Sequence, residues 1–283
     1  MGSGGFSARL QHALGRRWQV LICPHLPLAS RLHVLLSRHA IAADAVARLV
    51  RLDGDTLSIA IDGFNFSIPL PTVPQGRQKR LEAFNQVIAE TFVDPILFQG
   101  PVRPRQGDVV FDVGAHIGTT AALFSRIIGP GGKVFAFEPD VVETLRRHVA
   151  ENRLENVEVV ATAVGAATGT AELSSGDSGL DSSLVHALPW HGRKKTVPLV
   201  SLDEFVASRG IDRLDFIKMD IEGAEEPALE GSRQVIERFR PRWSISSYHT
   251  DASGDAQHPK LVRILERHGY SIHAINNFHI FAH

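Results

Sequence analysis

Three charged side chains alternate along one short segment, Lys218-Met219-Asp220-Ile221-Glu222-Gly223-Ala224-Glu225. In an extended backbone, residues two apart point to the same face, so Lys218, Asp220 and Glu222 share one face. Charges that follow an apolar run are costly to bury unless they are paired or used in chemistry. Two carboxylates could transfer protons or bind Mg²⁺ or Ca²⁺, although two oxygen donors are too few to predict a metal site. A salt bridge from Lys218 to either carboxylate, with no chemical role, is the alternative.

A histidine ends a second apolar segment, in Ser246-Ser247-Tyr248-His249. In open α/β sheets, ligands bind beyond the carboxyl ends of the strands. His249 would stand at such an end, and its ordinary pKa of about 6.5 suits a general base. The chain has 14 histidines, so a histidine could also occur at this place by chance.

The segment Val109–Gly118 runs from an apolar strand through a glycine turn toward a helix. Gly114 has no side chain to block a ligand from the backbone, and amides that open a helix bind polar groups. Asp112, two residues before Gly114, would repel a pyrophosphate and suits a cationic ligand. A turn that serves only strand–helix packing is the alternative. The candidate ligand-binding residues of this turn are Asp112, Gly114, Ala115, His116 and Gly118.

An acidic residue, Glu138, follows the next apolar strand, 133–137. A carboxylate at the end of the second strand can accept both ribose hydroxyls of a nucleoside. Glu138 comes 26 residues after Asp112, near the separation that a strand–helix–strand unit produces. We therefore expect a nucleoside site across these two strand ends, and a solvated loop carboxylate is the alternative.

Strands and helices alternate from residue 107 onward, which predicts an α/β fold with a doubly wound, mostly parallel sheet. A closing hairpin over 270–275 and 278–282 predicts an antiparallel C-terminal strand. An insertion over 166–205 separates two of the strands, and its polar stretch 174–183 is interpreted as a loop that could close over a bound acceptor. The remaining predicted strands are 109–113, 133–137, 157–164, 215–221 and 243–248, and the predicted helices are 119–128, 141–152, 224–239 and 259–268.

The first 104 residues predict a separate α+β N-terminal extension, with the main domain over 105–283. Helical spacing of apolar residues predicts one or two helices over 29–52, and 78–94 also has a helical pattern. Period-two alternation predicts a strand pair over 56–61 and 64–68. Residues 1–51 hold seven Arg and one acidic residue. This basic arm could meet an anionic partner or form a homodimer through its apolar face.

The composition is that of an ordinary globular protein, with 43% apolar and 22% charged residues among 283. A single cysteine, Cys23, excludes a disulfide or a cysteine-based zinc site within the chain. We see neither a signal peptide nor an apolar stretch long enough for a transmembrane segment, and expect a cytoplasmic protein. Nucleic acid is not an expected partner, because the basic arm lacks aromatic residues for base stacking beyond Trp18.

Taken in order, these motifs resemble the FkbM family of methyltransferases. The resemblance covers about residues 105–250 and rests on Asp112–Gly118, Phe137-Glu138-Pro139, Ala163-Val164-Gly165, Ser201-Leu202-Asp203 and Lys218–Glu225. It implies a class I methyltransferase fold that binds S-adenosylmethionine. It also implies O-methylation of a hydroxyl on a small-molecule or glycan acceptor, such as a sugar or another natural product. Mg²⁺ stays an open second cofactor because of the two carboxylates, Asp220 and Glu222.

On this resemblance and the residues themselves, we assign a role to each candidate residue as a hypothesis. The glycine turn would hold the methionine part, with Asp112 near its positive charge or organising the loop. Glu138 would hold the ribose, and Ala163 with Val164 would line the adenine site. The acceptor side would carry His249 as the first choice of base, with Asp220, Glu222 and Lys218. Where the family usually has Asn, this chain has His116. A non-catalytic binding or scaffold protein is therefore one alternative, and a nicotinamide-dependent oxidoreductase is another.

Overall fold

The computed structural model divides the chain into two compact units, Met1–Leu97 and Phe98–His283. It describes residues 101–175, 182–186, 192–275 and 277–283. Of the first unit, it describes only the backbone of three strands, β1 (Val50–Asp53), β2 (Thr56–Ile61) and β3 (Phe64–Pro69). The domain boundary between residues 104 and 105 stays a prediction. No helix in the described ranges is long and apolar enough to cross a membrane.

The three strands of the first unit form an antiparallel sheet in the order β1-β2-β3. The predicted strand pair is confirmed, because β2 pairs with β3. The predicted helix over 29–52 is wrong for its last three residues, because the backbone of Val50 and the residues after it pairs with β2. The rest of the basic arm, its expected dimer contact and the helix predicted over 78–94 lie outside the described residues.

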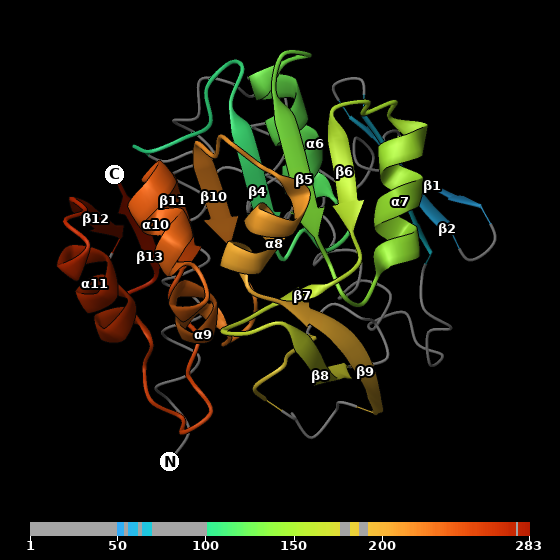
Figure 1. Ribbon diagram of the computed structural model, residues 1–283. Coiled ribbons are helices and arrows are strands. Elements are labelled where there is room, and N and C mark those ends of the chain that lie inside the picture. Colours follow the sequence, from blue (N-terminus) through green and yellow to red (C-terminus); the bar gives the residue numbers. More distant parts are fainter. Residues whose placement is uncertain are drawn as a thin grey trace. The chain divides into compact units, whose positions relative to one another are not determined.

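The second unit is built on a seven-stranded sheet in the order β12-β13-β11-β10-β4-β5-β6 (Figure 1). The five strands from β11 to β6 are parallel, and β13 runs antiparallel to both β11 and β12. This arrangement confirms the predicted doubly wound, mostly parallel α/β fold with an antiparallel C-terminal strand. The strands are β4 (Val109–Val113), β5 (Lys133–Phe137), β6 (Val157–Val160), β10 (Phe216–Met219), β11 (Arg242–Ser246), β12 (Ile272–Ile275) and β13 (His279–Ala282).

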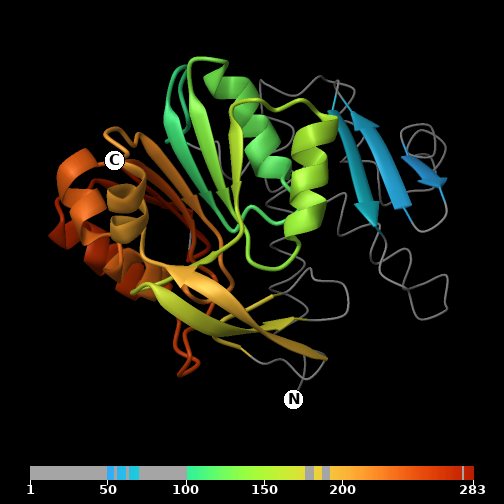
Figure 2. The same ribbon diagram turned by 45° about the vertical axis from the view of Figure 1, so that its right-hand side comes forward.

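Helices cover both faces of this sheet (Figures 1 and 2). On one face lie α6 (Thr119–Ile128) and α7 (Val142–Glu151), and on the other lie α8 (Leu202–Arg209), α10 (Arg233–Phe239) and α11 (His258–Arg267). The strands are apolar on both faces, so alternate residues feed two cores. Phe111 of β4 belongs to the core beneath α8, whereas its neighbour Val110 belongs to the core beneath α6.

Two predicted elements are each divided in the structure. The strand predicted over 157–164 is β6 and β7 (Ala163–Val164), and β7 pairs with a different sheet. The helix predicted over 224–239 is α9 (Glu225–Glu230) and α10, separated at Gly231. A Cβ on Gly231 would lie 2.3 Å from the carbonyl oxygen of Gly165. The helix therefore breaks where it packs against a distant backbone segment, and one uninterrupted helix was the wrong prediction.

A second, three-stranded sheet in the order β7-β9-β8 occupies part of the predicted insertion over 166–205. Its long strands are β8 (Gly169–Ser175) and β9 (Arg193–Val200), which pair antiparallel. The loop predicted over 174–183 is wrong for Ser174 and Ser175, which belong to β8. Backbone pairing and a small apolar cluster that includes Leu173 and Val197 hold these strands. Figures 1 and 2 show this sheet beyond the carboxyl ends of the central strands, where ligands bind in such folds.

One buried histidine makes the stability of this fold depend on pH. Burial and the positive charge of Lys218 lower the pKa of His279 from 6.5 to about 3. The unfolded chain therefore binds a proton below pH 6.5 that the folded chain does not bind until about pH 3. Across this window, His279 removes about 1.4 kcal/mol of stability for each pH unit of acidification.

We expect the His279→Gln variant to lose less stability than the wild type between pH 7 and pH 5. Glutamine can still hydrogen-bond to Ser244, whose Oγ lies 2.8 Å from His279 Nε2, and it does not titrate. Urea unfolding at the two pH values measures the difference, with the exposed His273→Gln variant as the control. Equal acid losses in the wild type and His279→Gln would show that His279 does not carry this dependence.

Candidate active site

The glycine turn between β4 and α6 lies directly against the end of β10. Gly114 adopts a left-handed backbone with φ of +80°, and a Cβ there would lie 1.9 Å from the carbonyl oxygen of Asp220. Gly118, at φ +94°, caps the start of α6. Gly114 therefore brings two strand ends together, which places the predicted ligand turn beside the predicted acidic segment.

We expect Gly114→Ala to destabilise the protein by more than about 3 kcal/mol, because the new Cβ meets a backbone oxygen that cannot move aside. Gly107 is a matched control, since it has a φ of +81° but open space around its Cβ position. Gly107→Ala then measures the backbone strain alone, of about 1–2 kcal/mol. Thermal unfolding compares the two variants, and equal losses would contradict the role of the close approach.

Glu138 is buried at the end of β5 and organises the same turn. One carboxylate oxygen accepts a hydrogen bond from the amide of His116 at 2.9 Å, and the other accepts from Asp140 at 2.6 Å and Val141 at 3.1 Å. His116 itself has a left-handed backbone, with φ of 49°. A carboxylate offers about four acceptor positions, so Glu138 keeps roughly one for a ligand hydroxyl.

Asp112 and Lys218 form a buried ion pair across β4 and β10. The two residues are direct partners in the strand register, and Lys218 Nζ lies 3.1 Å from Asp112 Oδ1. Thr120 Oγ1 donates to Asp112 Oδ2 at 2.7 Å, and Lys218 also donates to the carbonyl of Gly114 at 2.5 Å. The ion pair expected between Lys218 and Asp220 or Glu222 is thus replaced by one with Asp112, beneath the glycine turn.

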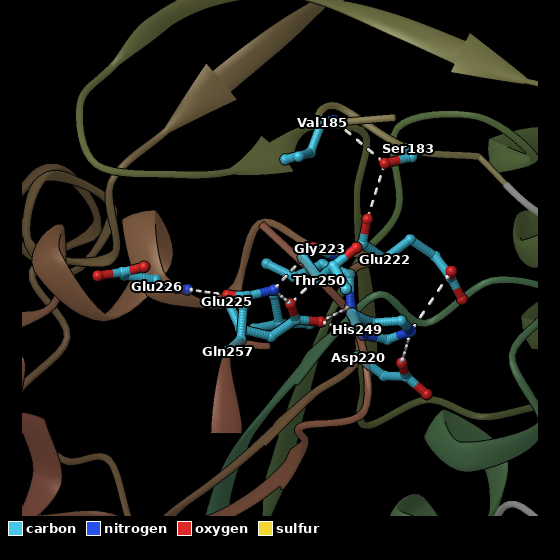
Figure 3. Close-up of polar contacts among 12 residues, drawn as sticks. Ser183, Val185, Asp220, Glu222, Gly223, Glu225, Glu226, His249, Thr250 and Gln257 are labelled. Carbon is cyan, nitrogen blue, oxygen red and sulfur yellow. Dashed lines mark hydrogen bonds and ion pairs between the residues drawn. The ribbon is translucent and has the colours of Figure 1, made fainter. Parts of the chain in front are cut away.

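A cluster of three acidic residues and one histidine forms where β10 and β11 end (Figure 3). His249 Nδ1 lies 2.9 Å from Glu225 Oε1, on one side of the ring. On the other side, His249 Nε2 lies 3.4 Å from Glu222 Oε2 and 3.8 Å from Asp220 Oδ1. The structure therefore brings together Asp220, Glu222 and His249, the residues that we expect on the acceptor side. We call Asp220, Glu222, Glu225 and His249 the acidic–histidine cluster.

Opposite charges set the protonation of this cluster. Burial lowers the pKa of His249, but attraction to Glu225 and Glu222 outweighs burial, so the pKa is raised well above 6.5. Burial raises the pKa of Glu225, but the nearby His249 outweighs it and the net shift is downward. For Asp220, burial dominates over His249 and Lys218 and raises the pKa to about 6. The ring of His249 thus carries positive charge among the carboxylates.

Glu225 is the functional residue that sequence reasoning missed. It is fully buried, and its carboxylate accepts hydrogen bonds from the amides of Ile221 and Gly223 and from Gln257 Nε2. Gln257 also accepts from the amide of Glu226, which ties this support to α9. The motif that runs from Lys218 to Glu225 already contained the signal, whereas nothing in the sequence pointed to Gln257.

The short segment 182–186, which lies between β8 and β9 in the chain, contacts the acidic–histidine cluster. Ser183 Oγ donates to the carbonyl of Glu222 at 2.7 Å, and His186 Nε2 lies 2.8 Å from the carbonyl oxygen of Thr250 (Figure 3 labels Ser183 and Thr250). Residues 176–181 of the loop expected to close over an acceptor lie outside the described residues.

The two residues assigned to adenine, Ala163 and Val164, form β7 at the edge of this region. Both side chains are buried, Ala163 against Leu173 and Val197, and Val164 in the main core. Only their backbone is therefore placed to face a ligand, and their role stays a prediction.

Comparison with known proteins agrees with this geometry. Residues 112–272 match the methyltransferase FkbM domain. The chain is 30% identical over 213 residues to the 31-O-demethyl-FK506 methyltransferase FkbM of Streptomyces tacrolimicus, covering 65% of this chain and 80% of that protein. It is 28% identical over 133 residues to the hexuronic acid methyltransferase AglP of Haloferax volcanii, covering 47% of this chain and 53% of that protein.

Among solved structures, methyltransferase FkbM from Methylobacillus flagellatus superposes with a TM-score of 0.46 and 24% identity, covering 65% of this chain and 46% of that one. The family match itself spans more than half of this chain, from the glycine turn through the acidic–histidine cluster. The chain therefore belongs to the FkbM family of S-adenosylmethionine-dependent methyltransferases.

Proposed function

We propose that this chain methylates a hydroxyl oxygen of a sugar or another natural product. The observation that carries the proposal is the position of the acidic–histidine cluster, at the carboxyl ends of β10 and β11 and directly beside the glycine turn. The names of two relatives support this proposal. One acts on 31-O-demethyl-FK506, which supports an oxygen acceptor. The other acts on a hexuronic acid, which supports a sugar-derived acceptor.

The residues around the glycine turn fit S-adenosylmethionine. Glu138 keeps one acceptor position for a ribose hydroxyl, and its hydrogen bond to the His116 amide holds the turn in place. Lys218 neutralises Asp112, so Asp112 shapes the turn and does not bind the cofactor's positive charge directly. When bound, the cofactor supplies a methyl group already activated by a positive sulfur.

On the acceptor side, we assign the proton acceptor to Asp220 and not to His249. The side chain of His249 is only 7% exposed and its Nε2 is buried, whereas 23% of the Asp220 side chain and 42% of the Glu222 side chain are exposed. An acceptor hydroxyl therefore meets a carboxylate before it meets the imidazole. His249, which Glu225 holds in place, positions the two carboxylates. As the general base, Asp220 should contribute about 10²- to 10⁴-fold to the rate of methyl transfer.

The proposal is tested by incubating the purified chain with S-adenosylmethionine that carries a deuterated methyl group. The acceptor panel contains sugars, uronic acids and hydroxylated polyketides, and mass spectrometry follows the label. We expect labelled methyl on an acceptor oxygen and release of S-adenosylhomocysteine. Cofactor binding without transfer to any acceptor would favour a scaffold protein, and transfer to nitrogen or carbon would contradict O-methylation.

A further inference from the structure

We propose that the acidic–histidine cluster is a divalent-cation site, with His249 Nε2, Asp220 and Glu222 as ligands. The role of the ion in methyl transfer rests on the proposed function, but the site itself does not. Asp220, Glu225 and His249 form a group of possible metal ligands whose donor atoms lie within 4.8 Å of one another. Glu225 faces the opposite side of the ring from Asp220 (Figure 3). We therefore take as the third ligand Glu222, which is not in this group but has Oε2 3.4 Å from His249 Nε2.

Two buried atoms that could bind a metal ion face each other without a hydrogen bond. In the described part of the chain, neither His249 Nε2 nor Asp220 Oδ1 has a hydrogen-bond partner, although both atoms are buried. Leaving a buried polar atom unsatisfied costs about 1–3 kcal/mol. An ion between these two atoms would satisfy both.

The spacing of the donors suits a small cation. Nε2 lies 3.4 Å from Glu222 Oε2 and 3.8 Å from Asp220 Oδ1. Metal–ligand bonds of about 2.1 Å place neighbouring donors roughly 3.0–3.4 Å apart. Each carboxylate needs to approach Nε2 by less than about 1 Å to reach this spacing, and the partly exposed side chains of Asp220 and Glu222 can move that far.

Glu225 supplies the support that metal-binding histidines generally have. A carboxylate that accepts from one ring nitrogen fixes the tautomer and leaves the other nitrogen for the metal. Glu225 Oε1 lies 2.9 Å from His249 Nδ1, and two backbone amides and Gln257 hold its carboxylate. The Nε2 lone pair is thereby aimed at Asp220 and Glu222, and an ion at Nε2 takes the place of a proton there.

The donor set favours Mn²⁺ over Mg²⁺ and Ca²⁺. One imidazole and two carboxylates combine a nitrogen ligand with hard oxygen ligands, a mixture that suits a first-row divalent ion. Ca²⁺ requires six to eight oxygen donors, more than this cluster provides. Because the Glu222 side chain is partly exposed, the acceptor hydroxyl could reach the ion from that side and occupy one of its coordination positions. The O–H bond then breaks, its proton goes to the Asp220 oxygen that does not bind the ion, and its electron pair stays on the acceptor oxygen.

Titration with Mn²⁺ tests the site without any turnover. The full chain is stripped with EDTA, and the electron paramagnetic resonance signal of free Mn²⁺ reports binding. We expect one ion per chain with micromolar affinity. His249→Gln and Glu222→Gln should weaken binding at least tenfold, and Glu225→Gln by about 10- to 100-fold through the lost support. Glu226→Gln is the matched control, because the carboxylate of Glu226 points away from His249 in Figure 3.

Mn²⁺ that stays free up to millimolar concentration in the wild type would overturn the inference, and so would equal binding by His249→Gln and Glu226→Gln. The outcome is separable from the proposed function. No Mn²⁺ binding in the titration, together with full methyl transfer in EDTA, would contradict the cation site and leave the proposed function standing. Stoichiometric Mn²⁺ binding with no transfer to any acceptor would support the site and contradict the function.

Discussion

We expect the Asp220→Asn variant to lose about 10²- to 10⁴-fold in turnover while it binds S-adenosylhomocysteine like the wild type. Asparagine keeps the size of the side chain but cannot take a proton from the acceptor. The backbone of Asp220 is unchanged, so its carbonyl still lies against Gly114 and the glycine turn keeps its shape. The loss should therefore appear in the rate constant for transfer and not in cofactor affinity.

The measurement is initial rates with a labelled methyl donor, combined with calorimetry of S-adenosylhomocysteine binding. Glu226→Gln is the control, because it removes a nearby carboxylate that pairs with Lys260 on the surface. A turnover of Asp220→Asn within threefold of the wild type would refute the assignment of Asp220. Equal losses in turnover and cofactor affinity would instead indicate a collapsed turn.

The Lys218→Met variant should lose about 3–5 kcal/mol of folding stability. Methionine fills most of the space of the lysine chain, but among the described residues it leaves the buried carboxylate of Asp112 with Thr120 as its one donor. Both members of the pair are nearly inaccessible, with side chains 3% and 0% exposed. An unpaired charge in such a place is costly, whereas the intact pair is close to neutral for stability.

The double variant Asp112→Asn/Lys218→Met separates the charge from the packing. It should recover a large part of the loss, because no charge is then left without a partner. The surface pair Lys133–Glu158, whose side chains are 41% and 30% exposed, provides the comparison, and Lys133→Met should cost at most about 1 kcal/mol. If urea unfolding finds the same cost for Lys133→Met and Lys218→Met, then the buried pair does not have this role.

The central sheet could be predicted from sequence because its strands are apolar runs between helical segments. For example, β4 ends directly before Gly114, and α6 begins directly after Gly118. The second sheet could not be predicted in this way. β8 and β9 are largely polar and exposed, so neither shows a buried face to the sequence pattern. The division at Gly231 depends on a contact with Gly165, which is far away in the chain.

The candidate site was predicted in part for a similar reason. Asp220 and His249 each follow a strand, and adjacent parallel strands bring their carboxyl ends together. The partners of these residues required the fold. Spacing of two within one strand suggested a pair between Lys218 and Asp220, whereas strand register placed Lys218 opposite Asp112. Glu225 enters the cluster because the turn at Glu222 and Gly223, with φ of 52° and 107°, folds the start of α9 back onto His249.

Calorimetric titration with S-adenosylmethionine and S-adenosylhomocysteine, with NAD as the control ligand, tests the central claim most directly. We predict micromolar binding of the first two ligands at one site per chain, lost in Glu138→Gln, and no binding of NAD. Absence of binding by both adenosyl ligands would contradict the assignment of the glycine turn and Glu138 to the cofactor, and binding of NAD alone would place the chain among the oxidoreductases.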